Sequence, residues 1–118
     1  MKAPLVAVVD DDPRIRELLA CELEDLGAEV LRCSDGAALL ALPQLPQLEL
    51  VLLDWMMPGL AGADALQQLQ ARGHQGRVVV VTALCDPQVK EQALGLGAAA
   101  VLLKTDALAA LPQLLNPD

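Results

Sequence analysis

The 118-residue sequence contains no phenylalanine and no tyrosine, and its only tryptophan is Trp55. Leucine, valine and alanine must therefore fill nearly all of the core, and 54% apolar residues are enough to form one in a single domain. Basic residues are also scarce, with 8 Lys+Arg against 16 Asp+Glu and a formal net charge of −8. Because this charge repels phosphate backbones and anionic membrane surfaces, we expect the domain to bind neither nucleic acid nor membrane.

Cysteine and histidine are too few and too scattered for a zinc site or a disulfide framework. Cys21, Cys33 and Cys85 form no C-x-x-C pair, and the only histidine, His74, lies in a glycine-rich stretch where we expect it to be solvated. The N-terminal apolar run is too short for a signal sequence or a membrane span. The sequence therefore predicts a soluble, cytoplasmic protein with free thiols.

Short runs rich in valine and leucine predict the strands of a parallel sheet. Near-continuous apolar runs of this length are typical of strands that are covered on both faces. The runs are residues 5–10, 29–33, 49–54, 77–82 and 99–104.

Helix signals lie between these runs. Asp12-Pro13 and Asp86-Pro87 each supply a capping side chain and a proline at the first helical position, and a glycine ends each helix. Leu66 and Leu69 mark a helix that Gly73 ends, and residues 34–36 open a weaker one that Pro43 and Pro46 break. The last helix follows Lys104 and meets Pro112 within about two turns, so we expect it to be short or kinked.

Strand and helix alternate five times, which predicts an α/β fold with a doubly wound parallel sheet and helices on both faces. Five such strands most commonly take the order 2-1-3-4-5, the flavodoxin-like arrangement. No linker or low-complexity segment divides the chain, so we expect residues 1–118 to form one domain.

Polar residues follow the predicted strands at their carboxyl ends, where such sheets bind ligands. The first strand ends in residues 10–12, all aspartates, the third in Asp54, the fourth in Thr82 and the fifth in Lys104. Carboxylates from two adjacent strands repel one another in a partly dry cleft unless a cation intervenes, and Mg²⁺ suits oxygen ligands of this kind. With Mg²⁺, a lysine and a hydroxyl, the site has what phosphoryl transfer needs, and a carboxylate can be the nucleophile.

Each of these residues also has a simpler explanation. A strand-end aspartate is usually a solvated turn residue, threonine is favoured in strands, and lysine usually extends to solvent. Those explanations do not predict that all of these residues lie together at the ends of adjacent strands. No glycine-rich phosphate loop is present in the sequence, since GLGAAA at 95–100 lacks the required lysine and strand-to-helix setting, so nucleotide binding is not expected.

Four stretches match the pattern of a known family, and they are VVDDD at 8–12, LLDWMMPGLAG at 52–62, VVVVTA at 78–83 and GAAAVLLK at 97–104. Through them the whole chain resembles the receiver domains of two-component response regulators. The resemblance implies a signalling module that catalyses only its own phosphorylation and dephosphorylation and is otherwise no enzyme. Its implied partners are a sensor histidine kinase or phosphotransfer protein and an unidentified downstream protein, and a phosphorylation-dependent homodimer is compatible with it.

The resemblance also implies a role for each strand-end residue. Asp54 would be the phospho-acceptor, and Thr82 and Lys104 would contact the phosphoryl oxygens. Asp12 matches no ligand of the family and keeps its role as a helix cap. The implied Mg²⁺ ligands are Asp11, Asp54 and the main-chain carbonyl of Met56, with Asp10 beside the ion or bound to it through water.

Two positions depart from the family pattern. Val101 stands where receiver domains usually have an aromatic residue in the fifth strand, so an aromatic rotamer switch is impossible, and Thr105 replaces the usual proline after the lysine. These changes leave open a second interpretation, a degenerate receiver that acts as a phosphate-independent interaction scaffold. An acid-nucleophile phosphatase is disfavoured because it needs a second aspartate where Met56 stands.

Overall fold

A computed structural model describes residues 3–57, 59, 61–84 and 86–116 of the chain. Five parallel strands form one sheet in the order β2-β1-β3-β4-β5, which confirms the predicted topology. The strands are β1 (Leu5–Val9), β2 (Glu29–Cys33), β3 (Leu50–Asp54), β4 (Arg77–Thr82) and β5 (Ala100–Leu103).

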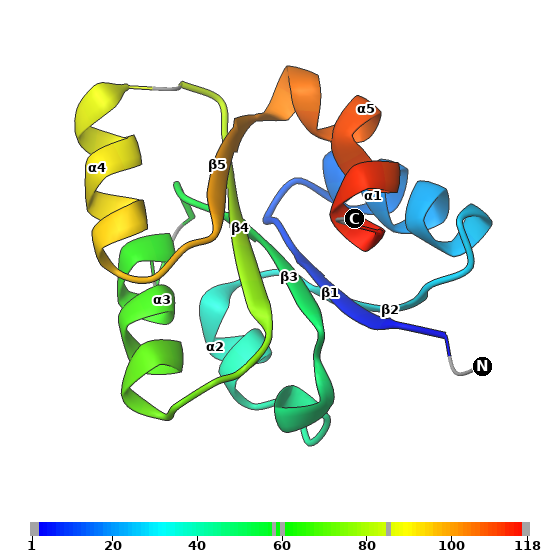
Figure 1. The fold of residues 1–118 in the computed structure, drawn as a ribbon, viewed down its shortest axis with the longest axis horizontal. Coiled ribbons are helices and arrows are strands. Elements are labelled where there is room, and N and C mark those ends of the chain that lie inside the picture. Colours follow the sequence, from blue (N-terminus) through cyan, green and yellow to red (C-terminus); the bar gives the residue numbers. More distant parts are fainter. Residues whose placement is uncertain (1–2, 58, 60, 85, 117–118) are drawn as a thin grey trace.

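Helices cover both faces of the sheet (Figure 1). On one face lie α1 (Pro13–Asp25) and α5 (Lys104–Leu115), and on the other lie α2 (Gly36–Leu40), α3 (Gly62–Ala71) and α4 (Pro87–Gly95). A short 3₁₀ helix, η1 (Leu45–Gln47), precedes β3. The predicted doubly wound arrangement is therefore confirmed.

The central strands are apolar at nearly every position because both of their faces are buried. In β3, Leu50 and Leu52 pack with α1 and α5, whereas Val51 and Leu53 pack with the helices of the other face. Successive side chains of a strand point to opposite faces, so a two-sided core requires a continuous apolar run rather than an alternating one. This burial carries β3 through the middle of the molecule and leaves Asp54 at its carboxyl end.

Three of the helices have an aspartate whose side chain caps the N-terminus. Asp12 accepts a hydrogen bond from the main-chain N–H of Arg14, and Asp86 accepts one from Gln88, as the Asp-Pro pairs predict. Asp35 caps α2 in the same way. The cap at Asp12 also sets where the acidic turn after β1 ends and α1 begins.

The last helix is longer than predicted. It runs through Pro112 as a helix of 12 residues, although proline cannot donate the hydrogen bond that Leu108 would otherwise accept. Ala107 and Leu111 are fully buried against the α1 side of the sheet, and this packing outweighs one missing hydrogen bond. Lys104 is also the first residue of α5 rather than the last of β5.

The sequence predicts a solvated His74, and this prediction is wrong. Its ring is half-buried after α3, and burial lowers the pKa of its imidazole. Its Nε2 atom is buried and makes no hydrogen bond within the described part of the chain. Cys21 and Cys33 are free thiols, while Cys85 lies outside the described residues.

Among the described ranges, no helix combines the length and the apolar character that crossing a membrane would require.

Candidate functional site

The register of the sheet brings the predicted site residues to one edge. Val9 pairs with Leu53 between β1 and β3, so the residues that follow them, Asp10 and Asp54, lie next to each other. Thr82 ends the neighbouring strand β4. All three of these side chains are buried, each with 2% of its surface exposed.

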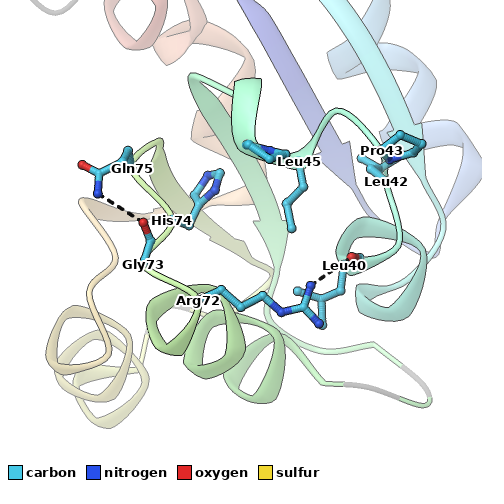
Figure 2. Close-up of a pocket in the computed structure, with 9 residues that line it drawn as sticks. Leu40, Leu42, Pro43, Leu45, Arg72, Gly73, His74 and Gln75 are labelled. Atoms are coloured by element: carbon cyan, nitrogen blue, oxygen red, sulfur yellow. Dashed lines mark hydrogen bonds between the residues drawn. The ribbon is translucent and has the colours of Figure 1, made fainter.

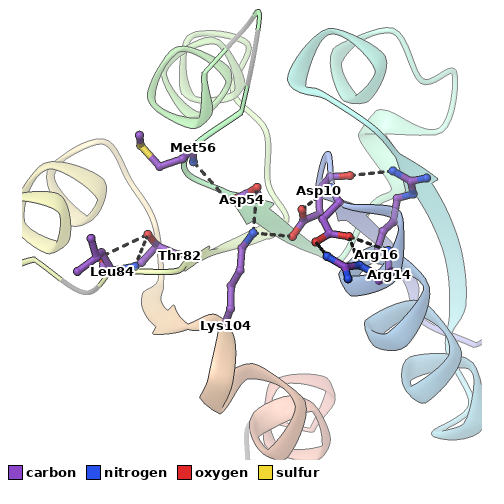
Figure 3. A network of polar contacts seen from close by, with 9 residues as sticks. Asp10, Arg14, Arg16, Asp54, Met56, Thr82, Leu84 and Lys104 are labelled. Carbon is purple, nitrogen blue, oxygen red and sulfur yellow. Dashed lines mark hydrogen bonds and ion pairs between the residues drawn. The ribbon is translucent and has the colours of Figure 1, made fainter.

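Lys104 bridges the two buried carboxylates from the side of α5 (Figure 3). Its Nζ atom lies 3.3 Å from Oδ2 of Asp54, to which it donates a hydrogen bond, and 3.2 Å from Oδ2 of Asp10. The lysine thus compensates part of the negative charge at this edge of the sheet.

The protonation of Asp54 reflects this environment. Burial, followed by repulsion from Asp10, raises the pKa of Asp54 from 3.8 to about 7, although Lys104 and the N–H of Met56 act in the opposite direction. Burial alone would lower the pKa of Lys104, but the two neighbouring carboxylates outweigh it and raise that pKa. A further positive charge near Asp54 would therefore favour the ionised form of its carboxylate.

Three carboxylates are close enough to hold a metal ion. Asp10, Asp11 and Asp54 each offer an oxygen atom, and these oxygens lie within 4.8 Å of one another. Asp11 is exposed, so an ion bound there would keep access to water. An all-oxygen, partly hydrated donor set suits Mg²⁺ better than zinc or copper, so the residues fit the predicted ion.

Main-chain N–H groups hold the carboxylates of Asp54 and Asp10 in place. The N–H of Met56 donates to Oδ1 of Asp54 at 3.3 Å, and the N–H of Asp12 donates to Oδ1 of Asp10 at 2.9 Å. The Met56 side chain is 73% exposed and points away from the core. Its carbonyl remains a predicted ligand.

Arg16 belongs to this site, and the sequence reasoning missed it. Its guanidinium donates from α1 to the main-chain carbonyl of Asp10 at 2.9 Å, which ties the acidic turn to the first turn of the helix (Figure 3). A signal was present, because Arg16 stands four residues after the helix cap Asp12 and so lies over that end of the helix.

The side chain of Thr82 forms hydrogen bonds within the loop that follows β4. Its hydroxyl donates to the carbonyl of Leu84 at 3.2 Å and accepts from the N–H of Leu84 at 3.3 Å. The Leu84 side chain is 76% exposed. The hydroxyl therefore holds the first residues after β4.

Gly62 allows the first residue of α3 to approach the end of β3. A Cβ atom at this position would lie 2.6 Å from the main-chain oxygen of Asp54 and 2.8 Å from Cα of Trp55. The N–H of Gly62 also donates to the carbonyl of Trp55 at 3.2 Å. Trp55 itself is buried in the core, as expected of a packing residue rather than a ligand.

The fold and this edge define the class of protein, a flavodoxin-like α/β domain with an acidic site at the carboxyl ends of its strands. The model of one family, described as the response regulator receiver domain, matches residues 6–116. The chain belongs to this family. Its members are the signalling modules of two-component response regulators rather than classical enzymes.

Individual relatives agree with this assignment. The chain is 37% identical over 99 residues to the transcriptional regulatory protein FixJ of Azorhizobium caulinodans, covering 84% of this chain and 47% of FixJ. It is 33% identical over 94 residues to the sensor histidine kinase GacS of Pseudomonas protegens, covering 77% of this chain and 10% of GacS. The chain thus spans about half or less of the curated relatives that it matches.

A solved receiver domain matches the whole fold. The signal receiver domain of the response regulator NarL from Mycobacterium tuberculosis superimposes with a TM-score of 0.86 at 31% identity, covering 100% of both chains. The chain and this solved domain therefore share the fold from β1 to α5.

Proposed function

We propose that Asp54 accepts a phosphoryl group from the phosphohistidine of a sensor histidine kinase or a phosphotransfer protein, with Mg²⁺ bound at the same edge of the sheet. One observation carries the proposal: a buried carboxylate at the end of β3 lies among two further carboxylates and the ammonium group of Lys104, with Thr82 ending the adjacent strand. A structural ion pair alone would not need Asp11, whose exposed carboxylate adds negative charge to an already repulsive cluster.

The chemical step is a displacement at phosphorus. An ionised oxygen of Asp54 forms the new P–O bond, the P–N bond to the donor imidazole breaks, and that nitrogen keeps the electron pair and takes a proton. With a pKa of about 7, Asp54 is only partly ionised at neutral pH. Mg²⁺, held by Asp11, Asp54 and the Met56 carbonyl beside Asp10, would keep this carboxylate ionised and neutralise charge on the phosphoryl oxygens.

After the transfer, Lys104 and Thr82 respond to the new group. Lys104 already reaches Oδ2 of Asp54, so its ammonium can pair with a phosphoryl oxygen attached there. Thr82 can donate to the phosphoryl group only by releasing the carbonyl of Leu84. The release changes the segment after β4, and with Val101 in place of an aromatic residue this segment itself must carry the change to a partner.

We infer that the domain acts in the cytoplasm, that residues 1–118 form one receiver domain, and that an unidentified downstream protein, or a second copy of the chain, recognises the phosphorylated surface. A net charge of −8 argues against nucleic acid as a direct partner of this domain.

A second candidate is a scaffold that binds its partner regardless of phosphate. It is favoured by Lys104, which bridges Asp10 and Asp54 and thereby compensates the acidic cluster without an added ion, and by the absence of an aromatic at Val101. In such a protein the strand-end residues would have no part in phosphoryl transfer.

Beryllofluoride, an analogue of an acyl phosphate, separates the two candidates. With Mg²⁺ present, a phosphorylation switch binds it and shifts the amide NMR signals of Thr82, Leu84 and their neighbours. Asp54→Asn, which cannot coordinate beryllium in this way, is the matched control. A spectrum that does not respond to beryllofluoride and Mg²⁺ would support the scaffold and contradict phosphorylation at Asp54.

A further inference from the structure

A groove lies at the end of the sheet opposite the acidic site. It has a volume of about 430 Å³ and opens between the segment that follows α2 and the loop that connects α3 to β4. These segments precede β3 and β4, whereas Asp54 and Thr82 end those strands. The lining residues are Leu40, Leu42, Pro43, Leu45, Pro46, Arg72, Gly73, His74 and Gln75, which we call the Arg72 groove.

One side of the Arg72 groove is apolar. Leu40 ends α2, and Leu42 and Leu45 follow it; all three line the groove (Figure 2), together with two prolines. Leu45 is buried, and Leu40 and Leu42 are half-buried. A hollow of a few hundred Å³ with an apolar side and a few polar groups has the general form of a small-molecule site.

The polar groups of the groove are basic or neutral. Arg72 extends across it and donates from Nη1 to the carbonyl of Leu40 at 3.1 Å, which fixes the guanidinium over the groove (Figure 2). The chain has 16 acidic residues against 8 basic ones, yet none of the described residues that line this groove is acidic. This local reversal of charge favours an anion.

His74 lines the groove beside Gly73 and Gln75. Its Nε2 atom is buried and has no hydrogen-bond partner among the described residues, although a buried polar atom normally has one. Burial lowers the pKa of His74, which disfavours the charged form of its ring. The Nε2 atom lies against Gly76, which does not line the groove, so the ring of His74 forms part of the groove wall rather than a donor to a ligand.

We propose that the Arg72 groove binds a small molecule with a carboxylate head and a short apolar tail. The carboxylate pairs with the free N–H groups of the Arg72 guanidinium, and the tail lies against the leucines. An arginine held by one hydrogen bond retains other N–H groups for a carboxylate, which gives the groove its preference for an acid over a neutral amide of the same shape. The site does not depend on phosphorylation of Asp54.

Hexanoate is the probe, followed by amide NMR of the ¹⁵N-labelled protein at constant ionic strength. We expect saturable shifts concentrated at residues 40–46 and 72–76, with a dissociation constant on the order of millimolar for so small a ligand. Hexanamide and acetate should bind more weakly, because the first lacks the charge and the second lacks the tail. Equal binding of hexanamide, or shifts that grow linearly without saturation, would overturn the proposal.

Substitutions test which residues of the groove contact hexanoate. Arg72→Gln should weaken hexanoate binding by about fivefold or more, whereas Lys90→Gln on exposed α4, which removes the same charge, should leave it unchanged. Leu42→Gln tests the apolar side without touching the guanidinium and should also weaken binding. A wild-type affinity in Arg72→Gln would refute the site. Saturable binding at these residues by a peptide with a C-terminal carboxylate, but not by hexanoate, would assign the groove to a protein partner instead.

Discussion

Replacing Asp54 by asparagine should stabilise the protein at neutral pH when Mg²⁺ is absent. The side chain is 2% exposed, and its carboxylate lies beside that of Asp10. Burial and this repulsion both oppose its ionised form, and Lys104 offsets them only in part. Asparagine has nearly the same shape and carries no charge.

The size of the effect follows from the pKa. A rise from 3.8 to about 7 makes ionised Asp54 unfavourable by about 4 kcal/mol relative to the unfolded chain, at about 1.4 kcal/mol for each pH unit. The amide loses the charge attraction of Lys104, so we expect a smaller net gain, about 1–3 kcal/mol at pH 8.

The effect should depend on pH with a definite sign. Between the unfolded pKa of 3.8 and the folded value of about 7, the folded protein binds a proton that the unfolded chain does not, so Asp54 makes the wild type lose stability as the pH rises. Above pH 7 that loss is complete. Asp54→Asn lacks it, so the difference between the two proteins should be small near pH 4 and largest at pH 8.

Urea denaturation in EDTA at several pH values measures this difference, with the fluorescence of buried Trp55 as the signal. Adding Mg²⁺ should then stabilise the wild type much more than Asp54→Asn, because an ion that binds only the folded state shifts the equilibrium toward it. A variant that is less stable than the wild type at pH 8 in EDTA, or a difference that does not change with pH, would refute this reasoning.

Three further predictions concern the same edge of the sheet. Lys104→Met should cost about 1–3 kcal/mol of unfolding free energy without Mg²⁺, because it leaves two buried carboxylates uncompensated, and Mg²⁺ should recover part of it; an unchanged urea midpoint would contradict this. Gly62→Ala should cost about 1–3 kcal/mol because its Cβ would meet the main chain of β3, whereas Gly95→Ala, which meets no atom within 4 Å, should be neutral or slightly stabilising; equal urea midpoints would show that α3 yields. The phosphorylated protein should lose phosphate over minutes or longer, because the exposed side chains two residues after Asp54 and Thr82 are apolar and cannot orient water, a contribution of about 10²-fold; a half-life of seconds would rule this out.

The order of the elements could be predicted from the sequence because local signals and tertiary burial agree. The apolar runs of β1, β3 and β4 are buried on both faces, and Asp12 and Asp86 cap the helices that their neighbouring prolines begin. The length of α5 could not be predicted, because the proline signal is local whereas the burial of Leu111 depends on α1 and the sheet.

The site was predictable to the extent that it depends on strand ends. Parallel strands bring their carboxyl ends to one edge, which is enough to place Asp10, Asp54 and Thr82 together. Arg16 was missed because its partner is a main-chain carbonyl, which no residue type identifies. The burial of His74 was missed for a related reason, since its Nε2 atom packs against Gly76 beside the main chain of Leu48, a contact that the local glycine pattern does not indicate.

The central claim is that Asp54 accepts a phosphoryl group, and the mass of the intact protein after incubation with phosphoramidate and Mg²⁺ tests it most directly. We expect the gain of one phosphoryl group, which requires Mg²⁺, is released by mild alkali as expected of an acyl phosphate, and does not form on Asp54→Asn. No gain in mass by a folded wild-type protein, or the same gain in Asp54→Asn, would contradict it.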